Sequence, residues 1–234
     1  MKKRFIFLLL AMLVFATACG GNGSKADPPA GNGSGSGGGG QEAQTNKIPD
    51  GFVEKTLSEV PIVMSIPEAW FYVDTSTANL DELYENMENL GIGEDYVEIA
   101  KQASMVYMLD IANNTDEFTP NFNITCTDSG GIRQSDLKDG IEPLTAIYAE
   151  QFSVYPFSGF SWVNTLSGKN YGDNYYLVMV ANYTISGISV RGCQAITINN
   201  DKNYTFTYVS LEKDFKDEMF TVFESVLGTI EFTD

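Results

Sequence analysis

The chain has 234 residues, of which 31 are acidic, 14 are basic and none is histidine, so its formal net charge is −17 at pH 7. Nucleic-acid binding needs Lys and Arg side chains that neutralise phosphates, and this charge balance excludes it. The absence of histidine excludes a Ser-His-Asp triad, a Cys-His dyad and any His-ligated zinc or iron site. We therefore expect no metal and no cofactor.

Residues 1–18 have the form of an export signal. Three basic residues at positions 2–4 precede an apolar run, Phe5–Phe15, and small residues follow up to Ala18. The run is too short to span a membrane core, which needs about 20 apolar residues. Cys19 follows directly and resembles the lipidated cysteine of the bacterial lipobox, although Ala16 stands where that motif usually has leucine. The alternative is an ordinary signal-peptidase site followed by an incidental cysteine.

A tether follows the cysteine. Residues 20–47 hold ten of the 22 glycines and no large apolar residue, so they cannot bury enough surface to fold. Without the three basic residues of the signal the net charge falls from −17 to −20, which disfavours electrostatic binding to anionic lipids. The lipobox resemblance then implies that acyl chains on Cys19 hold residues 19–47 and a folded domain, 48–234, outside the cytoplasm. Such a tether suits a Gram-positive surface, but the Gram type stays open.

The first half of the domain predicts a mixture of strands and helices. An apolar stretch with prolines, 60–67, suits an edge strand or the first strand of a sheet, and Glu68-Ala69-Trp70 turns the chain, with Trp70 anchored in the core. Asn79-Leu80-Asp81-Glu82 has the form of a capping box. It predicts a helix through Leu90, and a shorter helical piece is expected at 96–103. Strands are expected at 104–111 and 121–127, separated by a turn at 113–116.

The second half predicts a helix, a strand meander and a last helix. The first helix runs through Leu144 and Phe152, with Pro143 in its first turn. Three or four long strands follow, joined by short turn-rich connections that favour antiparallel neighbours. Their ranges are 160–166, 174–184, 189–199 and 203–211. Apolar residues at helical spacing from Phe215 to Val226 predict an amphipathic helix, whose acidic start complements the helix dipole. The fold class is α+β, an antiparallel β-sheet flanked by helices.

A family resemblance rests on three features. These are the Ile66-Pro67-x-x-Trp70 opening, the long meander, and a closing stretch that joins the aromatic strand Tyr204–Tyr208 to a helix with Phe215, Phe220, Phe223 and Leu227. Together they resemble the PsbP-like (Mog-type) domains over roughly residues 50–234. The resemblance implies a PsbP-like α/β/α sandwich without a catalytic centre, as in bacterial lipoproteins of undefined role. No functional residue of the family can be placed on this chain.

Two clusters are candidate binding surfaces. Aromatic side chains around the start of the meander can stack on sugars or peptides if exposed, although strand aromatics more often belong to a core. They are Tyr155, Phe157, Phe160, Trp162, Tyr175 and Tyr176. A run of carboxylates could attract a cation or a basic partner, or it could simply be a solvated helix face. It comprises Glu82, Glu85, Glu88, Glu94 and Asp95.

Two further features have a structural and a functional interpretation. Cys126 and Cys193 lie in predicted strands, and export permits a disulfide between them, although two buried free thiols are the other interpretation. The stretch Asn199–Asn203 faintly resembles a calcium loop but lacks its length and its bidentate glutamate, so we expect a hairpin turn there.

Taken together, the sequence predicts a membrane-anchored, non-catalytic binding or accessory module with an unknown ligand. Two alternatives remain: a cell-envelope hydrolase that uses paired carboxylates, and a receptor for a small solute or peptide. The expected partners are the membrane, through the lipid, and an envelope protein, peptide or glycan. The sequence leaves the oligomeric state open.

Overall fold

The computed structural model describes residues 48–73, 106–153, 157–185 and 187–233. Strands dominate these residues. In chain order the elements are β1 (Phe52–Thr56), β2 (Ile62–Pro67), β3 (Trp70–Val73), β4 (Val106–Asp110), η1 (Ile111–Asn113), β5 (Asn121–Asp128), α3 (Gln134–Asp139), α4 (Ile141–Gln151), β6 (Phe157–Tyr171), β7 (Asn174–Ile185), β8 (Ile188–Asn199), β9 (Lys202–Leu211), η2 (Glu212–Asp214), α5 (Asp217–Leu227) and β10 (Glu231–Phe232).

The centre of the described structure is a seven-stranded sheet in the order β3-β4-β5-β9-β8-β7-β6, and every neighbouring pair in it is antiparallel. Strands β6 to β9 form the predicted meander. The meander then closes on β5, which joins residues far apart in the sequence. The predicted α+β class, with an antiparallel sheet flanked by helices, is confirmed.

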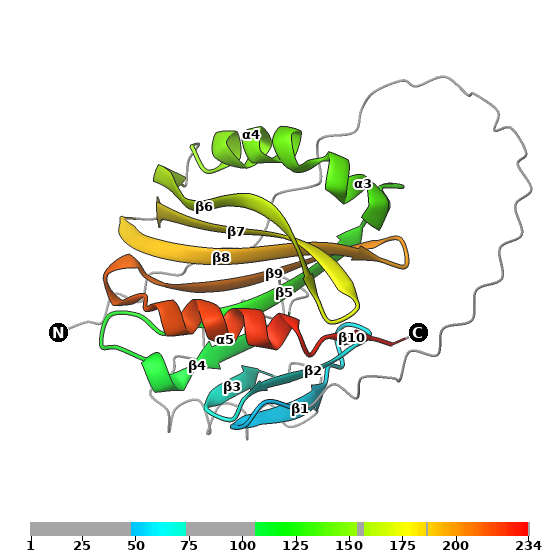
Figure 1. Cartoon of the computed structure of the whole chain (residues 1–234). Coiled ribbons are helices and arrows are strands. Elements are labelled where there is room, and N and C mark those ends of the chain that lie inside the picture. The colour runs from blue at the N-terminus through cyan, green and yellow to red at the C-terminus, as the bar shows by residue number, and fades with distance from the viewer. Residues whose placement is uncertain (1–47, 74–105, 154–156, 186, 234) are drawn as a thin grey trace, which may run out of the picture.

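Three layers are visible in Figure 1, with α3 and α4 over one face of the sheet and α5 with a small sheet over the other. Because side chains alternate between the faces of a strand, two apolar clusters result. The α5 face of the sheet carries Phe122, Phe206 and Tyr208, packed against Phe223 of α5. The α4 face carries Leu177, Met179 and Tyr183, packed against Tyr148 and Phe152.

The small sheet corrects one prediction. Strand β2 is the middle strand of the order β1-β2-β10, not an edge strand. The two-residue strand β10 pairs with Ile62 and Val63 on the side opposite β1. The prolines are compatible with this central place because Pro61 precedes the strand and Pro67 ends it.

Helix α5 joins the two sheets. Its buried residues Met219, Phe223, Val226 and Leu227 follow the predicted helical spacing. Just beyond the helix, Thr229 ties the chain to β2, since its Oγ1 accepts a hydrogen bond from the backbone N of Ser65 at 2.9 Å. Helix α5 is therefore fastened to the small sheet by hydrogen bonding as well as by apolar contact.

Most predicted elements of the described ranges are present, and some were missed. The strands around 106–110 and 121–128, the helix with Pro143 in its first turn and the final helix all form. The turn at Asn200-Asp201 is a two-residue hairpin with positive φ at both residues, so the hairpin prediction is confirmed. Strands β1, β3 and β10 and helix α3 were not predicted. The predicted helices at 79–90 and 96–103 lie outside the described residues.

Candidate functional site

A pocket of about 460 Å³ lies where the β2–β3 turn, the end of β4 and the start of α5 meet. Its walls are mostly apolar, with a few polar groups among them, which is the usual composition of a ligand site. The lining residues are Pro67, Ala69, Trp70, Asp110, Ala112, Asn113, Tyr208, Lys216, Glu218, Met219 and Val222. They come from four separate parts of the chain, so only the folded domain assembles this pocket.

Trp70 forms the aromatic wall of the pocket. The Glu68-Ala69 turn leads directly into β3, and Trp70 is its first residue, with only 7% of its surface exposed. Its ring stacks on Tyr208 with centroids 5.7 Å apart and lies 5.4 Å from the ring of Phe122. The predicted core anchor at Trp70 is therefore confirmed, and the same contacts hold its ring in place beside the pocket.

Asp110 supplies the buried carboxylate. Its Oδ2 accepts hydrogen bonds from the hydroxyl of Tyr208 and from Nδ2 of Asn113, both at 2.8 Å. Its Oδ1 accepts from the backbone N of Asn113 at 3.2 Å, which starts η1. Burial, reinforced by the adjacent Asp110, raises the pKa of the Tyr208 hydroxyl. Asp110 therefore serves to lock β4, β9 and η1 together at the base of the pocket.

The rim of the pocket carries opposite charges. Lys216 and Glu218 are exposed, on either side of the first residue of α5. Met219 and Val222 lie one turn further along the helix and supply apolar wall. This arrangement suits a ligand that inserts an apolar group into the pocket and keeps a polar or charged part at the rim. Lys216 can pair with a negative charge of the ligand, and Glu218 with a positive one.

The predicted aromatic surface is only partly realised. Phe157, Phe160 and Trp162 of β6 are half-buried and pack on the α4-face cluster. Phe160 stacks on Phe152 at 5.4 Å and meets Trp162 edge-on at 4.8 Å. These rings therefore cover the end of α4 and are only partly exposed to solvent.

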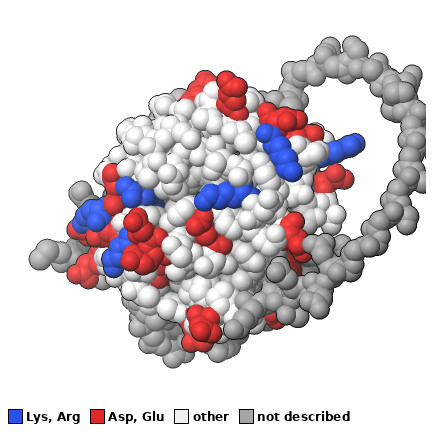
Figure 2. Space-filling model, in the orientation of Figure 1, with Lys and Arg blue, Asp and Glu red and all other residues white. Residues whose placement is uncertain are grey.

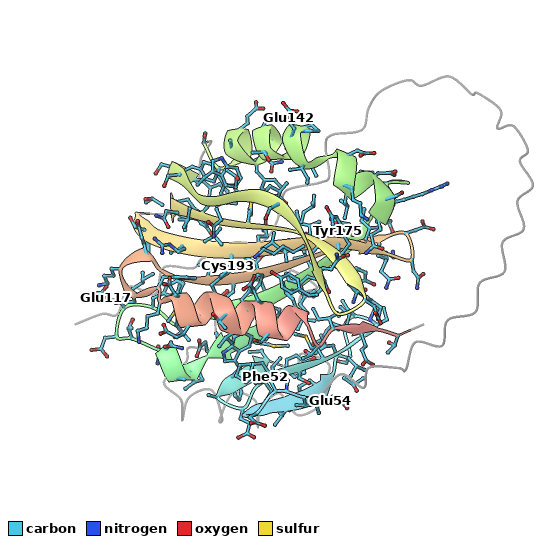
Figure 3. The ribbon with its side chains drawn as sticks, viewed as in Figure 1. Phe52, Glu54, Glu117, Glu142, Tyr175 and Cys193 are labelled. Atoms are coloured by element: carbon cyan, nitrogen blue, oxygen red, sulfur yellow. The ribbon has the colours of Figure 1, made fainter. Side chains whose placement is uncertain are left out.

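Of the two tyrosines of β7, only Tyr175 packs on the same α4-face cluster as the β6 rings. Tyr176 is fully buried and belongs to the opposite, α5-face cluster, which corrects its prediction as a surface residue. Tyr175 is half-buried, and its ring lies 5.0 Å from Nζ of Lys138 (Figure 3). Consecutive strand residues point to opposite faces, so the pair could never share one surface. Tyr155 lies outside the described residues.

Both cysteines of the domain are free, so the alternative of a disulfide is not realised. Cys126 pairs with Tyr204 on one side of β9, and Cys193 pairs with Tyr208 on the other. Four residues of strand correspond to about 14 Å, whereas a disulfide needs Cα atoms within about 7 Å. Burial raises the pKa of both thiols, and Cys193 lies in the interior (Figure 3).

Other predicted sites lie outside the described residues. These are the lipidation residue Cys19 and the acidic run with Glu82, Glu85, Glu88, Glu94 and Asp95. Within the described ranges, no three His, Cys, Asp or Glu side chains are grouped to hold a metal. None of the helices described is long and apolar enough to cross a membrane.

The central residues of the pocket were missed as a site. Tyr208 was noted only as part of an aromatic strand, and Asp110 was not singled out. One signal was present: Asp110 is the single charged residue of the predicted apolar strand 104–111, and a carboxylate buried in such a strand needs hydrogen-bond donors. That signal does not identify the donors, since Tyr208 is 98 residues away in sequence.

Comparison with known proteins gives structural similarity alone. No protein-family model matches the sequence, and no curated protein matches it. Among solved structures, PsbP of Synechocystis sp. PCC 6803 aligns over 85% of this chain and 98% of its own, at 14% identity and a TM-score of 0.43. LpqN of Mycobacterium tuberculosis, a protein involved in cell envelope biogenesis, aligns over 74% of this chain and 83% of its own, at 11% identity and a TM-score of 0.47.

A third similar structure is a protein of Bacteroides thetaiotaomicron, with 12% identity and a TM-score of 0.42 over 77% of this chain. The chain spans about half of that protein, 48% of its length. At these TM-scores the likeness is partial, so neither a family nor a function is transferred to this chain.

Proposed function

We propose that this protein is an exported lipoprotein, anchored through Cys19, whose acidic α+β domain acts outside the cytoplasm as a non-catalytic binding module. Residues 1–18 would direct export and residues 19–47 would tether the domain, 48–234, to the membrane. The support for export and anchoring is the sequence alone: a basic start, a short apolar run, small residues and then a cysteine.

The pocket beside Trp70 is the observation that supports binding. Its walls are apolar, and its buried carboxylate, Asp110, already accepts hydrogen bonds from Tyr208 and Asn113. A general acid or base must exchange a proton with substrate within hydrogen-bonding reach, and these bonds hold Asp110 in a structural role. The pocket is therefore better suited to holding a group than to transforming it.

The ligand class follows from the lining. An apolar side chain would fit between Trp70, Met219 and Val222, with its polar flanks beside Lys216 and Glu218. A volume of about 460 Å³ is within the range of small-molecule sites. We propose a short peptide segment that inserts one apolar side chain.

Anchoring is tested by replacing the lipidated residue. The Cys19→Ala variant should move from the membrane fraction to the soluble envelope fraction or the medium, because the net charge of −20 that remains once the signal is removed provides no electrostatic attachment. Retention of this variant in membranes, at the level of the unchanged protein, would contradict the anchor.

Ligand binding is tested through Trp70, one of only two tryptophans. In the Trp162→Phe protein, Trp70 is the remaining tryptophan, and pools of capped tripeptides without tryptophan can be screened for a change in its selectively excited emission. Pools with an apolar central residue should change it, and polar pools should not. Ala112→Phe, at the pocket, should remove the response, whereas Ala146→Phe, on the exposed face of α4, should leave it unchanged. A response that persists in Ala112→Phe, or no response to any pool, would contradict the proposal.

A further inference from the structure

A second pocket, of about 570 Å³, lies beside the segment that joins β9 to α5. It is formed by the start of β8, the end of β9 and η2. Its lining residues are Glu117, Gly187, Ile188, Ser189, Arg191, Leu211, Glu212 and Lys213. Figure 2 shows acidic and basic side chains side by side at this end of the molecule.

Arg191 is held in place before any ligand arrives. Its Nε donates to Oδ1 of Asn182 at 2.8 Å, and Nδ2 of Asn182 donates in turn to Oε1 of Glu212 at 2.8 Å. The guanidinium group also lies over the ring of Phe215, 5.2 Å from its centroid. Only Nε of the guanidinium has a hydrogen-bond acceptor among the described residues, so the two terminal amino groups remain available.

A guanidinium fixed in this way suits a carboxylate, which it can bind through two parallel hydrogen bonds. The charges around Arg191 restrict the chemical class of the ligand further. The lining contains two cations, Arg191 and Lys213, and two anions, Glu117 and Glu212, so its formal charge is zero. A purely anionic ligand would also be repelled by a protein with a net charge of −17.

A zwitterionic ligand avoids that repulsion because its net charge is zero. We propose that this pocket binds a free amino acid or short peptide, with its carboxylate on Arg191 and its ammonium group beside Glu212. Ile188 and Leu211 supply apolar surface for the side chain of the ligand. Glu117 is already paired with Lys213 at 2.5 Å, which leaves Glu212 as the carboxylate beside Arg191. This site is separate from the pocket at Trp70 and does not depend on it.

Calorimetry on the full-length protein with alanyl-alanine as the probe tests the site. We expect saturable binding that weakens at least tenfold when either terminus of the probe is blocked, by N-acetylation or by C-terminal amidation. Arg191→Gln should weaken it at least tenfold. Ile188→Trp, which fills the pocket but keeps the arginine, should also weaken binding at least tenfold. Because this variant retains Arg191, its loss of binding cannot come from misfolding caused by a change at position 191.

Lys202→Gln is the matched control, because it removes an exposed cation that pairs with Asp128 at the β8–β9 hairpin, outside this pocket. It should leave binding unchanged. The inference is overturned if alanyl-alanine shows no saturable binding, if the N-acetylated probe binds equally well, or if Arg191→Gln binds as the unchanged protein does. Responses of Trp70 to capped peptides are measured separately, so failure of one site leaves the other intact.

Discussion

The two faces of the seven-stranded sheet are built differently. On the α5 face, Trp70, Phe122, Phe206, Tyr208 and Phe223 are all less than 8% exposed, and their rings form a continuous set of contacts. On the α4 face, the aromatic side chains of β6 are half-buried and end at the edge of the sheet. The first face is closed by a helix and a second sheet, the other by helices packed near one edge (Figure 1).

The α4 face also contains a buried polar row. Asn123 of β5 pairs with Thr207 of β9, which pairs with Gln194 of β8, so the three side chains lie side by side across the central strands. They are 2%, 3% and 8% exposed. Asn123 Oδ1 and Gln194 Oε1 have no hydrogen-bond partner among the described residues. An unpaired buried acceptor costs about 1–3 kcal/mol, so this face carries a penalty at its centre.

This difference in packing indicates that the two faces of the sheet have different roles. The pocket at Trp70 adjoins the start of α5, where close packing holds Trp70 and Tyr208 in place. The second pocket meets both faces, since its Arg191 lies over Phe215 while its Ile188 and Leu211 pack on the α4-face cluster. Rigid elements position binding groups more accurately than loosely packed ones. We therefore propose that the α5 side provides both stability and the binding surface of the pocket at Trp70.

The largest effect is expected from core truncation on the α5 face. Phe122→Ala should lower the free energy of unfolding by about 3–5 kcal/mol, because it empties a fully buried position among three aromatic rings. Phe160→Ala on the α4 face should cost less than about 2 kcal/mol, since its ring is already partly exposed. Urea unfolding of both variants measures the contrast. Equal losses would show that the two faces are equally well packed.

High pH should unfold the protein cooperatively. Burial raises the pKa of Tyr204 to about 12, and it also raises the pKa of Tyr148, Tyr176, Tyr183 and Tyr208. Because an unfolded tyrosine ionises near pH 10, the folded state binds more protons above that pH. Stability is therefore full below about pH 10 and falls as the pH rises through about 12. Tyrosinate absorbance should rise together with loss of circular dichroism. Gradual ionisation in folded protein would contradict the assigned burial.

The polar row predicts that the buried Gln194 can be replaced by an apolar residue with little loss of stability. Gln194→Met removes the unpaired Oε1 together with a hydrogen bond of 3.2 Å to Thr207, so the free energy of unfolding should change by no more than about 1 kcal/mol. Gln194→Glu is the matched comparison and should destabilise strongly, because it buries a charge. A loss above about 2 kcal/mol in Gln194→Met would show that the amide oxygen is bonded in solution.

The smallest effect concerns the thiols and leaves stability unchanged. In folded Cys19→Ala protein, iodoacetamide should label the half-buried Cys126 slowly and leave the buried Cys193 unlabelled, because burial raises both pKa values and Cys193 is also inaccessible. Urea should expose two reactive thiols. Adding Cys126→Ser should abolish labelling of the folded protein, and residual labelling there would place Cys193 nearer the surface.

Periodicity predicted the strand meander and the last helix, because their apolar residues recur at the period of the element that they form. It missed β10, which has two residues and pairs only through a partner far away in sequence. It also could not show that Asn121 and Asn123 are buried. Because these polar residues alternate with Phe122 and Ile124, the sequence places them on the opposite face of the strand. It does not show whether another layer of the fold covers that face.

The candidate sites were harder to predict for the same reason. The aromatic stretch was visible as a local cluster, yet alternation sends Tyr176 to one face of the sheet and the β6 rings to the other. The pocket at Trp70 joins side chains such as Asp110, Tyr208 and Lys216, which only the pairing of β4, β5 and β9 brings together. No local pattern specifies that pairing.

Site-specific photo-crosslinking on intact cells tests the assignment of binding to the α5 side most directly. A benzophenone side chain would replace Ala112, at the pocket beside Trp70, or Val163, which is 42% exposed on the edge strand β6. Mass spectrometry should find peptide adducts from position 112 that capped apolar tripeptides displace, and no such adducts from position 163. Displaceable adducts from position 163, with none from position 112, would contradict the account.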